Sequence, residues 1–424
     1  MSLCAGKTIQ AAGSPRAARY RRIENSGGET GSSMSISDQF NKRAVALKPS
    51  GIRKFFDLAY TMENVVSLGI GEPDFVTPWH IRDAGIYSLE KGNTMYTPNG
   101  GLPRLRAAVA DYLRRRFDMA YQPEEILITV GGSEAIDLAL RAFIEPGDEV
   151  VIPEPCFVCY DPITQLCGGV PVPVATLAED EFRLTAERLE KVLTPRTKVL
   201  ILPFPNNPTG AVMRREHLEP IAELCIRHDL IVVSDEIYGE LTYGDERHVS
   251  ISTLPGMRER TIVVSGLSKS HAMTGWRIGY AAAPSEAAKL MTKIHQFALM
   301  CAPITSQYAA VEALEAGDGD IQEMREEYDR RRRFICDGLN RIGLPCFEPR
   351  GAFYVFPDIR PTGLSSDEFC KRLLYERSVA VIPGNAFGAA GEGFVRCSYA
   401  YSVQKISVAL ERIEAFVQSL RSGK

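Results

Sequence analysis

Residues 124–144, EEILITVGGSEAIDLALRAFI, contain the transition that decides the fold. The apolar run at 124–130 is typical of a buried strand, and residues 133–144 place apolar side chains at helical spacing. Two glycines between them, Gly131 and Gly132, allow a tight turn. A strand, a turn and a helix in this order form the repeating unit of an α/β protein.

The same alternation continues along the chain. Further runs rich in Val, Ile and Leu predict strands, and the amphipathic stretch 215–229 predicts a helix between two of them. Because near-continuous apolar runs mark strands buried on both faces, we expect a doubly wound α/β fold with a mostly parallel sheet flanked by helices. The runs are DEVVIP (148–153), GGVPVPV (168–174), TKVLILP (197–203), DLIVVSD (229–235) and RTIVVSG (260–266).

The pattern changes after residue 284. A long helical region at 285–342 carries the basic run DRRRR at 329–333, which we expect to be a solvated helix face. The segments that follow predict a smaller α+β domain, to which residues 36–70 should add. They are GAFYVFPDI (351–359), a helix at 365–377, VAVIPG (379–384) and FVRCSYA (394–400).

Composition narrows the function. The net charge of −4 argues against a nucleic-acid binder, and no apolar stretch reaches the length of a membrane span. Ten scattered cysteines indicate free thiols in a reducing cytoplasm. Cys156 and Cys159 have the spacing of a redox or metal pair, but the six histidines are dispersed. We therefore expect buried thiols and no metal site.

Residues 1–35 differ from the rest of the chain. They are rich in Ser, Gly and Arg without apolar periodicity, which predicts a disordered segment. We interpret residues 1–33 as a tag or upstream extension. A transit peptide is the less favoured alternative because Glu24 and Glu29 interrupt the basic character.

Polar residues follow four of the predicted strands, where open parallel sheets bind their ligands. Ser133 opens a helix after the glycine turn, so this end could bind a phosphate or could simply be a helix cap. Asn207, in the turn FPNNPTG (204–210), could donate its amide to a ligand oxygen or could serve the turn alone.

Two further strand ends carry ionisable groups. Asp235 ends a buried strand, where its carboxylate needs either a helix N-cap or a cation such as a protonated ring nitrogen. Tyr238 should lie beside it. Lys269, in SGLSKSHAMTGWRIGY (265–280), is a nucleophile only as a free amine with a lowered pKa, and Arg277 is a neighbouring cation that could bind a phosphate.

Together these groups fit a phosphorylated heterocyclic aldehyde held as a Schiff base, which is pyridoxal 5'-phosphate. The nucleotide-binding patterns GxGxxG and Walker A are missing from the strand–helix turns of this sequence.

From about residue 36 to 420 the chain resembles class I aminotransferases of fold type I. The resemblance implies an N-terminal arm and part of the small domain at 36–80, a large cofactor-binding domain at 81–295 and a small domain at 296–424. The matching stretches, in order, are SGIRKFFDLA, SLGIGEPDF, YTPNGGLPRLR, GGSEA, NNPTG, VVSDEIY, SGLSKSHAMTGWRIGY, GAFYVFP and VRCSYA.

The resemblance also implies residue roles. Lys269 would form the Schiff base and move the Cα proton, Asp235 would keep the pyridine nitrogen protonated, and Tyr238 and Asn207 would donate to the ring oxygen. The implied cofactor-binding residues are Gly132, Ser133, Glu134, Phe157, Asn207, Asp235, Tyr238, Ser268, Lys269, Arg277 and Tyr96. The implied substrate-binding residues are Gly71, Asn207 and Arg396, of which Arg396 would grip the α-carboxylate.

The expected reaction moves the amino group of an L-amino acid, aromatic, aspartate or related, to a 2-oxo acid, with 2-oxoglutarate as the expected acceptor. Tyr96 matches a tyrosine that reaches the neighbouring subunit's cofactor, which implies a homodimer with shared active sites. A second substrate-binding arginine has no clear match, which argues against strict aspartate specificity. The alternatives are a β-eliminating lyase of the same fold and an aminotransferase specific for N-acetyl-diaminopimelate.

Overall fold

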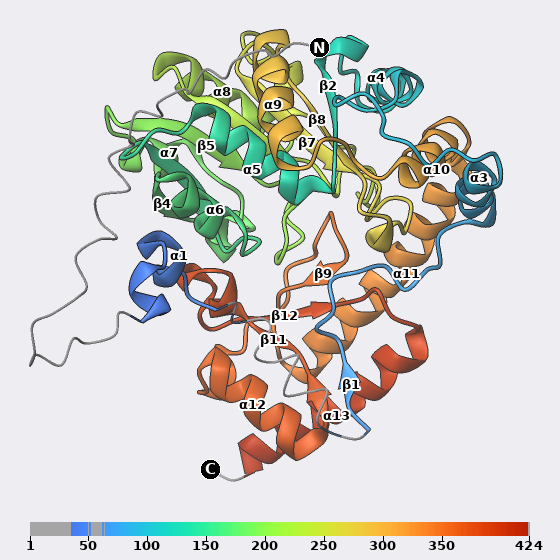
Figure 1. Ribbon diagram of the computed structural model, residues 1–424. Coiled ribbons are helices and arrows are strands. Elements are labelled where there is room, and N and C mark those ends of the chain that lie inside the picture. The colour runs from blue at the N-terminus through green and yellow to red at the C-terminus, as the bar shows by residue number, and fades with distance from the viewer. Residues whose placement is uncertain (1–34, 50, 52–61, 63, 423–424) are drawn as a thin grey trace, which may run out of the picture. The chain divides into compact units, whose positions relative to one another are not determined.

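The computed structural model describes residues 35–49, 51, 62 and 64–422 (Figure 1). Along the sequence they divide into two units, the first ending at Val45 and the second beginning at Ala46. The first unit contains η2 (Ile36–Gln39), capped by the Ser35 side chain, and most of α1 (Lys42–Ala46). The disorder predicted for residues 1–35 falls, apart from Ser35, outside the described residues. The following description concerns the second unit.

A seven-stranded sheet dominates the second unit, in the order β2-β8-β7-β6-β5-β3-β4 (Figure 1). The five strands β3 to β7 pair in parallel, and β8 is antiparallel to both of its neighbours. The mostly parallel sheet is therefore confirmed. The strands are β2 (Ile126–Thr129), β3 (Glu149–Glu154), β4 (Val170–Ala175), β5 (Thr197–Leu202), β6 (Ile231–Asp235), β7 (Thr261–Gly266) and β8 (Gly279–Ala282).

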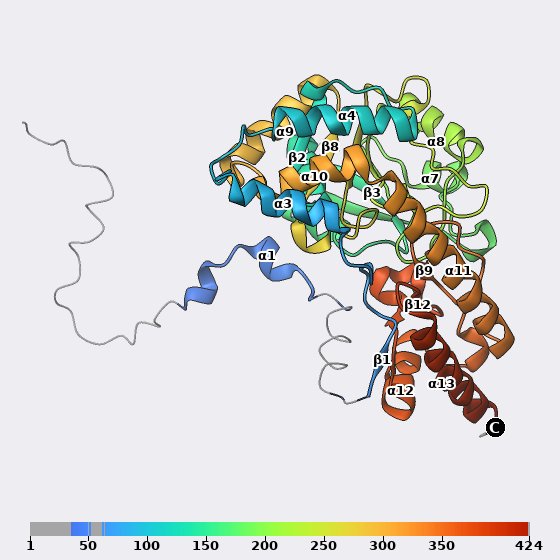
Figure 2. The ribbon, with the colours of Figure 1, turned by 90° about the vertical axis from the view of Figure 1, so that its right-hand side faces the viewer.

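Helices cover both faces of this sheet, because successive apolar side chains of each strand point to opposite sides. Leu200 packs in a cluster with α7 and α8, whereas Ile201 packs in a cluster with α5, α6 and α9. On the first face α4 and α10 also cover β2 and β8, with α3 beside them (Figure 2). The helices are α3 (Trp79–Glu90), α4 (Pro103–Phe117), α5 (Gly132–Phe143), α6 (Tyr160–Cys167), α7 (Ala186–Val192), α8 (Arg215–Arg227), α9 (Ser285–Ala298) and α10 (Ile304–Ala316).

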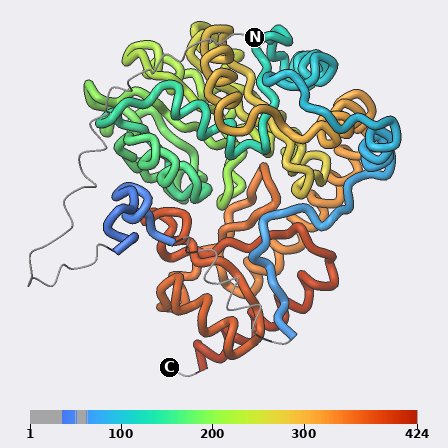
Figure 3. The backbone as a smooth tube through the Cα atoms, viewed as in Figure 1, coloured from blue at the N-terminus to red at the C-terminus, as the bar shows by residue number. Residues whose placement is uncertain are grey.

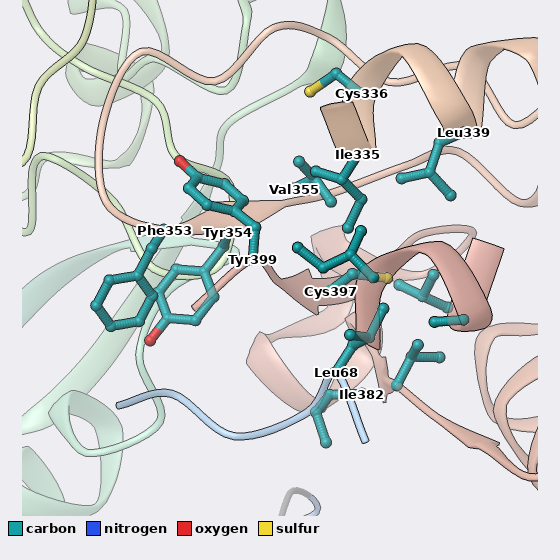
Figure 4. Close-up of a cluster of buried hydrophobic side chains, with 14 of the residues drawn as sticks. Leu68, Ile335, Cys336, Leu339, Phe353, Tyr354, Val355, Ile382, Cys397 and Tyr399 are labelled. Atoms are coloured by element: carbon teal, nitrogen blue, oxygen red, sulfur yellow. The ribbon is translucent and has the colours of Figure 1, made fainter. Parts of the chain in front are cut away.

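Two small sheets lie among the remaining helices. The parallel pair β1 and β10 joins residues 66–67 to the C-terminal part, and β9, β11 and β12 form an antiparallel sheet. Leu68, Ile335 and Cys397 belong to their shared core (Figure 4). The elements are β1 (Val66–Ser67), α11 (Asp318–Ile342), β9 (Tyr354–Val355), α12 (Ser366–Arg377), β10 (Val379–Ala380), β11 (Ile382–Pro383), β12 (Val395–Ser398) and α13 (Val403–Ser422).

The expectation that the basic run 329–333 forms a solvated face is wrong for two of its arginines. Arg332 is 2% exposed, and its Nη1 donates to Glu348 Oε1 at 2.6 Å and to the Pro349 carbonyl at 3.1 Å. Arg331 is 6% exposed and pairs with Asp74. Consecutive helical residues point in different directions, so a run of like charge does not share one environment.

The cysteines of the described residues are free thiols, as the sequence predicts. Burial raises the pKa of both Cys156 and Cys159, which leaves these two thiols unreactive. Within the part of the chain that the structure describes, no group of side chains has the arrangement of a metal site. Within the same residues, no helix combines the length and apolar character needed to cross a membrane.

A histidine joins three helices at the edge of the larger sheet. His80 on α3 contacts Glu312 on α10 through Nδ1 at 2.8 Å and Asp320 on α11 through Nε2 at 2.9 Å. The backbones of α3 and α10 run side by side (Figure 3). Partial burial opposes the charged imidazolium, but the two carboxylates outweigh it and raise the pKa of His80 above its ordinary value of 6.5. The bridge is therefore strongest with His80 protonated.

We expect His80→Gln to lower the apparent melting temperature mainly at mildly acidic pH. Because the folded-state pKa is raised, the stabilisation is fully present below the ordinary histidine pKa and is lost as pH rises through the folded value. Thermal unfolding at a series of pH values measures this, with the exposed His228→Gln as control. An equal loss at every pH would contradict the role of the charged bridge.

Candidate active site

A cavity of about 610 Å³ opens beyond the carboxyl ends of β5, β6 and β7, between the larger sheet and residues of β1, β9 and β12 and their loops. Most of the predicted site residues meet there. The lining includes Gly71, Gly132, Ser133, Phe157, Asn207, Asp235, Tyr238, Ser268, Lys269, Arg277 and Arg396 among the predicted set, and Ile70, Glu72, Ile136, Tyr160, Ile237, Thr274 and Tyr354 in addition.

Lys269 follows the end of β7 and reaches into the cavity. Its Nζ donates to the Gly71 carbonyl at 2.8 Å. Burial is the main cause that lowers the pKa of Lys269 to about 8; Glu72 opposes this shift, and the neighbouring Arg396 and Arg277 contribute to it. A lysine with this pKa supplies far more free amine near neutral pH than an ordinary lysine does.

Asp235 is the last residue of β6, where the buried strand delivers its carboxylate to the cavity. The Tyr160 hydroxyl donates to its Oδ2 at 2.8 Å, and the Ile237 N–H donates to its Oδ1 at 3.2 Å. Burial raises the pKa of Asp235 to about 6, and these two donors limit the rise. The carboxylate is thus mainly ionised above pH 6 and can hold a protonated ring nitrogen.

Arg396 on β12 is a buried guanidinium at the opposite wall. Its Nη1 donates to Asn207 Oδ1 at 2.9 Å and its Nη2 to the Gly69 carbonyl at 2.5 Å. Its Nε is buried without a hydrogen-bond partner among the described residues. The group lies 4.5 Å from the Tyr354 ring centroid and 4.8 Å from that of Phe387. An arginine fixed in this way is suited to a planar carboxylate.

Tyr238 and Tyr354 connect the two walls, since their hydroxyl oxygens lie 2.8 Å apart. Gly71 passes close to this pair: a Cβ at residue 71 would lie 2.6 Å from the Tyr354 Oη. Only glycine leaves this approach open, which explains its place in GIGEPDF.

The start of α5 faces Arg277 at the other end of the cavity. Gly131, with φ +82°, makes the turn, and a Cβ there would lie 2.5 Å from the Arg277 Nη2. The Arg277 Nη1 donates to the Thr274 carbonyl at 3.0 Å. The first N–H groups of α5, the Ser133 hydroxyl and this guanidinium form a set of donors that fits a phosphate.

Two predicted site residues lie apart from the cavity lining. Glu134 accepts the Val130 N–H at 2.5 Å through Oε2, and its Oε1 lies 2.7 Å from Nδ1 of the buried His295. Its carboxylate therefore supports the turn before α5. Tyr96 is 80% exposed on the surface of this chain.

Sequence reasoning missed Tyr160 and Tyr354. Tyr160 lies three residues after Phe157 in PCFVCY, a spacing that can bring two side chains into one site when a helix begins there. Tyr354 lies in GAFYVFP, which we quoted as a matching stretch without assigning a role. Their contacts with Asp235 and Tyr238 span 75 and 116 residues, so only the fold reveals them.

The donor set fits pyridoxal 5'-phosphate. Arg277 and the start of α5 suit its phosphate, Asp235 suits its ring nitrogen, and the Lys269 amine suits its aldehyde carbon. Phe157 lines the cavity where an aromatic side chain can cover a ring. The unpartnered Arg396 Nε leaves hydrogen-bonding capacity for a further anion.

We predict that Tyr160→Phe raises the pKa of Asp235 above about 6, because the lost hydrogen bond favours the ionised carboxylate. Carbon-13 NMR of the cofactor-free protein labelled at aspartate carboxyl groups measures the pKa. The Asp235→Asn protein assigns the resonance. A pKa equal to or lower than that of the wild type would show that the phenol does not stabilise the ion.

Known proteins that resemble this chain identify its family. The family model of aminotransferase class I and II matches residues 63–413. The chain is 48% identical to the aspartate aminotransferase of Pyrococcus abyssi, covering 90% of this chain and 98% of the relative. It is 46% identical to aromatic-amino-acid aminotransferase 2 of Thermococcus litoralis, with coverage of 90% and 98%.

Among solved structures, the aromatic aminotransferase of Pyrococcus horikoshii superposes with a TM-score of 0.83 at 47% identity, covering 87% of this chain and 99% of that one. Both the fold and the sequence match over nearly the full length of these relatives. The chain therefore belongs to the class I and II aminotransferase family and is a pyridoxal-phosphate-dependent aminotransferase.

Proposed function

We propose that the Lys269 Nζ carries the cofactor as a Schiff base and that the enzyme moves the amino group of an L-amino acid to 2-oxoglutarate. The observation that supports this most strongly is the desolvated Lys269 amine, placed in one cavity with the Asp235 carboxylate and the Arg396 guanidinium. This arrangement combines a nucleophile, an acid for the ring nitrogen and a site for the substrate carboxylate.

Each residue then has a defined task. Arg396 binds the substrate α-carboxylate, while Asn207 and the Gly69 carbonyl hold the guanidinium in place. The bound cofactor supplies an electron sink that acidifies the substrate Cα–H bond. With the cofactor bound, the Lys269 Nζ would accept the substrate Cα proton and donate it back, and the ionised Asp235 would hold the protonated ring nitrogen.

The lining that a single chain provides favours an amino-acid substrate whose side chain is neutral or aromatic. Among the described residues that line it, the cations are Lys269, Arg277 and Arg396, and each has a task above. No further arginine or lysine of these lining residues is left for a second carboxylate. The relatives are named for aspartate and for aromatic amino acids, so both donors belong in a test.

Lys269→Ala should lower kcat by about a hundredfold or more, because it removes the base that moves the Cα proton. Turnover is measured with 2-oxoglutarate and L-phenylalanine, L-aspartate or N-acetyl-LL-diaminopimelate as donor. Lys289→Ala, at an exposed position of α9, is the matched control. Full turnover by Lys269→Ala would disprove the proposed role.

Addition of L-cysteine to this panel tests the alternative reaction. An eliminating lyase would release pyruvate and ammonia from L-cysteine without any 2-oxo acid. Dependence of turnover on 2-oxoglutarate supports transamination, and its absence would favour elimination.

We also propose a homodimer. Large apolar side chains are exposed near the C-terminal end of α9 and in the loop at residues 93–99. A hydrogen bond of 3.2 Å from the Asn99 Nδ2 to the Gln296 Oε1 connects the loop to the helix. Met95 is 78% exposed, Tyr96 80% and Phe297 79%, which is more than a monomer ordinarily leaves in one area. A partner subunit covering this area would explain the exposure and would bring Tyr96 to the neighbouring site.

Phe297→Glu should convert the dimer to a monomer, because it places a charge in the apolar contact. Sedimentation velocity measures the mass, and turnover should fall together with dimerisation. Tyr375→Glu, an exposed aromatic on α12, is the control and should remain dimeric. A wild type that is monomeric and fully active would contradict the shared site.

We further propose a cytoplasmic location. The free thiols of the described cysteines, several of them buried, are typical of proteins in a reducing compartment.

A further inference from the structure

The segment from Gly69 to Thr77, which we call the strap, contacts two cations of the cavity, Arg396 and Lys269. The Gly69 carbonyl accepts from the Arg396 Nη2 at 2.5 Å, and the Gly71 carbonyl accepts from the Lys269 Nζ at 2.8 Å. The two carbonyls are two residues apart, so a shift of the strap displaces both contacts together. The position of this segment thus influences substrate binding and catalysis at once.

The strap has little internal structure to hold it. Residues 69–77, all of them described, form neither helix nor strand between β1 and α3. Its first end is fixed by β1 and by the Tyr401 hydroxyl, which accepts the Ile70 N–H at 3.3 Å. Its last end is fixed by Thr77, whose hydroxyl donates to the Ala272 carbonyl at 2.6 Å. Between these ends the Thr274 hydroxyl donates to Glu72 Oε2 at 3.3 Å, and a charged anchor attaches the segment to α11.

That anchor is Asp74 with Arg331. The Arg331 Nη1 donates to Asp74 Oδ1 at 2.8 Å and to Oδ2 at 2.9 Å. The Arg331 Nε donates to Glu327 Oε1 at 2.7 Å, which fixes the guanidinium on α11. The Arg331 guanidinium carbon lies 5.3 Å from the Phe75 ring centroid and 5.8 Å from that of Tyr328.

The ion pair of Asp74 and Arg331 is partly buried. The Arg331 side chain is 8% exposed and that of Asp74 is 29% exposed. Removing either partner removes the two hydrogen bonds that attach the middle of the strap to α11, so the strap would lose its position. Arg331 is not among the residues that line the cavity, so it acts on the reaction only indirectly.

We propose that Arg331 is a positioning residue: through Asp74 it fixes the strap, and the strap fixes the Gly69 carbonyl against Arg396 and the Gly71 carbonyl against Lys269. This role rests on the proposed function for its kinetic consequence but not for its structural one. The arginine comes from the middle of the helix α11, a 25-residue element packed against α13 and β9, which makes a rigid support.

The experiment compares Arg331→Gln, Asp74→Asn and the conservative Arg331→Lys with the wild type. Arg333→Gln is the matched control, because it lies two residues later on α11 with its side chain 63% exposed. Hydrogen–deuterium exchange of the cofactor-free protein reports the strap directly. Steady-state kinetics of the holoenzyme with L-phenylalanine and with L-aspartate report the site, and melting temperature verifies folding.

Arg331→Gln and Asp74→Asn should each increase exchange in residues 69–77 and raise the donor KM about tenfold or more, with a smaller change in kcat. Arg331→Lys should restore part of the KM, since it keeps the charge without the planar fork. Arg333→Gln should match the wild type in both readouts.

Exchange in residues 69–77 that is unchanged in both Arg331→Gln and Asp74→Asn would overturn the proposal, as would a donor KM equal to that of the wild type. Equal loss of protection across the whole chain would also overturn it, because it would show a general structural role. A wild type inactive with both donors would instead refute the proposed donors, and the exchange result would still decide the role of Arg331.

Discussion

The hydrogen-bonded register of three parallel strands determines the rest of the site. Leu202 of β5 lies opposite Ser234 of β6, and Asp235 lies opposite Val264 of β7. The carboxyl ends of the three strands therefore lie at one edge of the sheet. The turn with Asn207, the Asp235 carboxylate and the loop with Lys269 all lie at this edge. Apolar side chains on both faces of each strand fix this register, since a slip by one residue would exchange the two faces.

Burial at this edge acts on two ionisable groups in opposite directions. It lowers the pKa of Lys269 to about 8 and raises the pKa of Asp235 to about 6, because it disfavours the charged form of each. Both groups thus titrate close to neutral pH. At a pH above the pKa of Asp235, its carboxylate is ionised. As the pH approaches the pKa of Lys269, a larger fraction of its side chain is the free amine. The enzyme meets both requirements in the neutral to mildly alkaline range.

Much of this could be predicted from sequence, because the responsible signals are local. Apolar runs predicted the strands β2 to β7, and polar residues directly after them predicted Asn207, Asp235 and Lys269. Strand β8 was missed because GYAA is short and contains no β-branched residue. The long helical region at 285–342 divides into α9, α10 and α11.

Features that depend on distant contacts could not be predicted. Tyr160 and Tyr354 contact the predicted site residues Asp235 and Tyr238 only in the folded chain. Arg331 and Asp74 form an ion pair although 257 residues separate them in sequence. The basic run around Arg331 predicts a solvated face, because charge alone gives no sign of the carboxylates, such as Asp74, that lie near it in the folded chain. Long-range ion pairs of this kind have no local pattern.

The predicted boundary between the large and the small domain at residue 295 stays a prediction. The helix α10, which follows this boundary, packs on α3 and α4.

The central claim is that the desolvated Lys269 amine is the point of cofactor attachment. Reduction of the holoenzyme with borohydride makes a lysine–cofactor bond permanent, and peptide mass spectrometry then locates it. The account predicts the added mass of the reduced cofactor on the peptide that contains Lys269. Attachment to a different lysine, or a cofactor that remains fully dissociable after reduction, would contradict it.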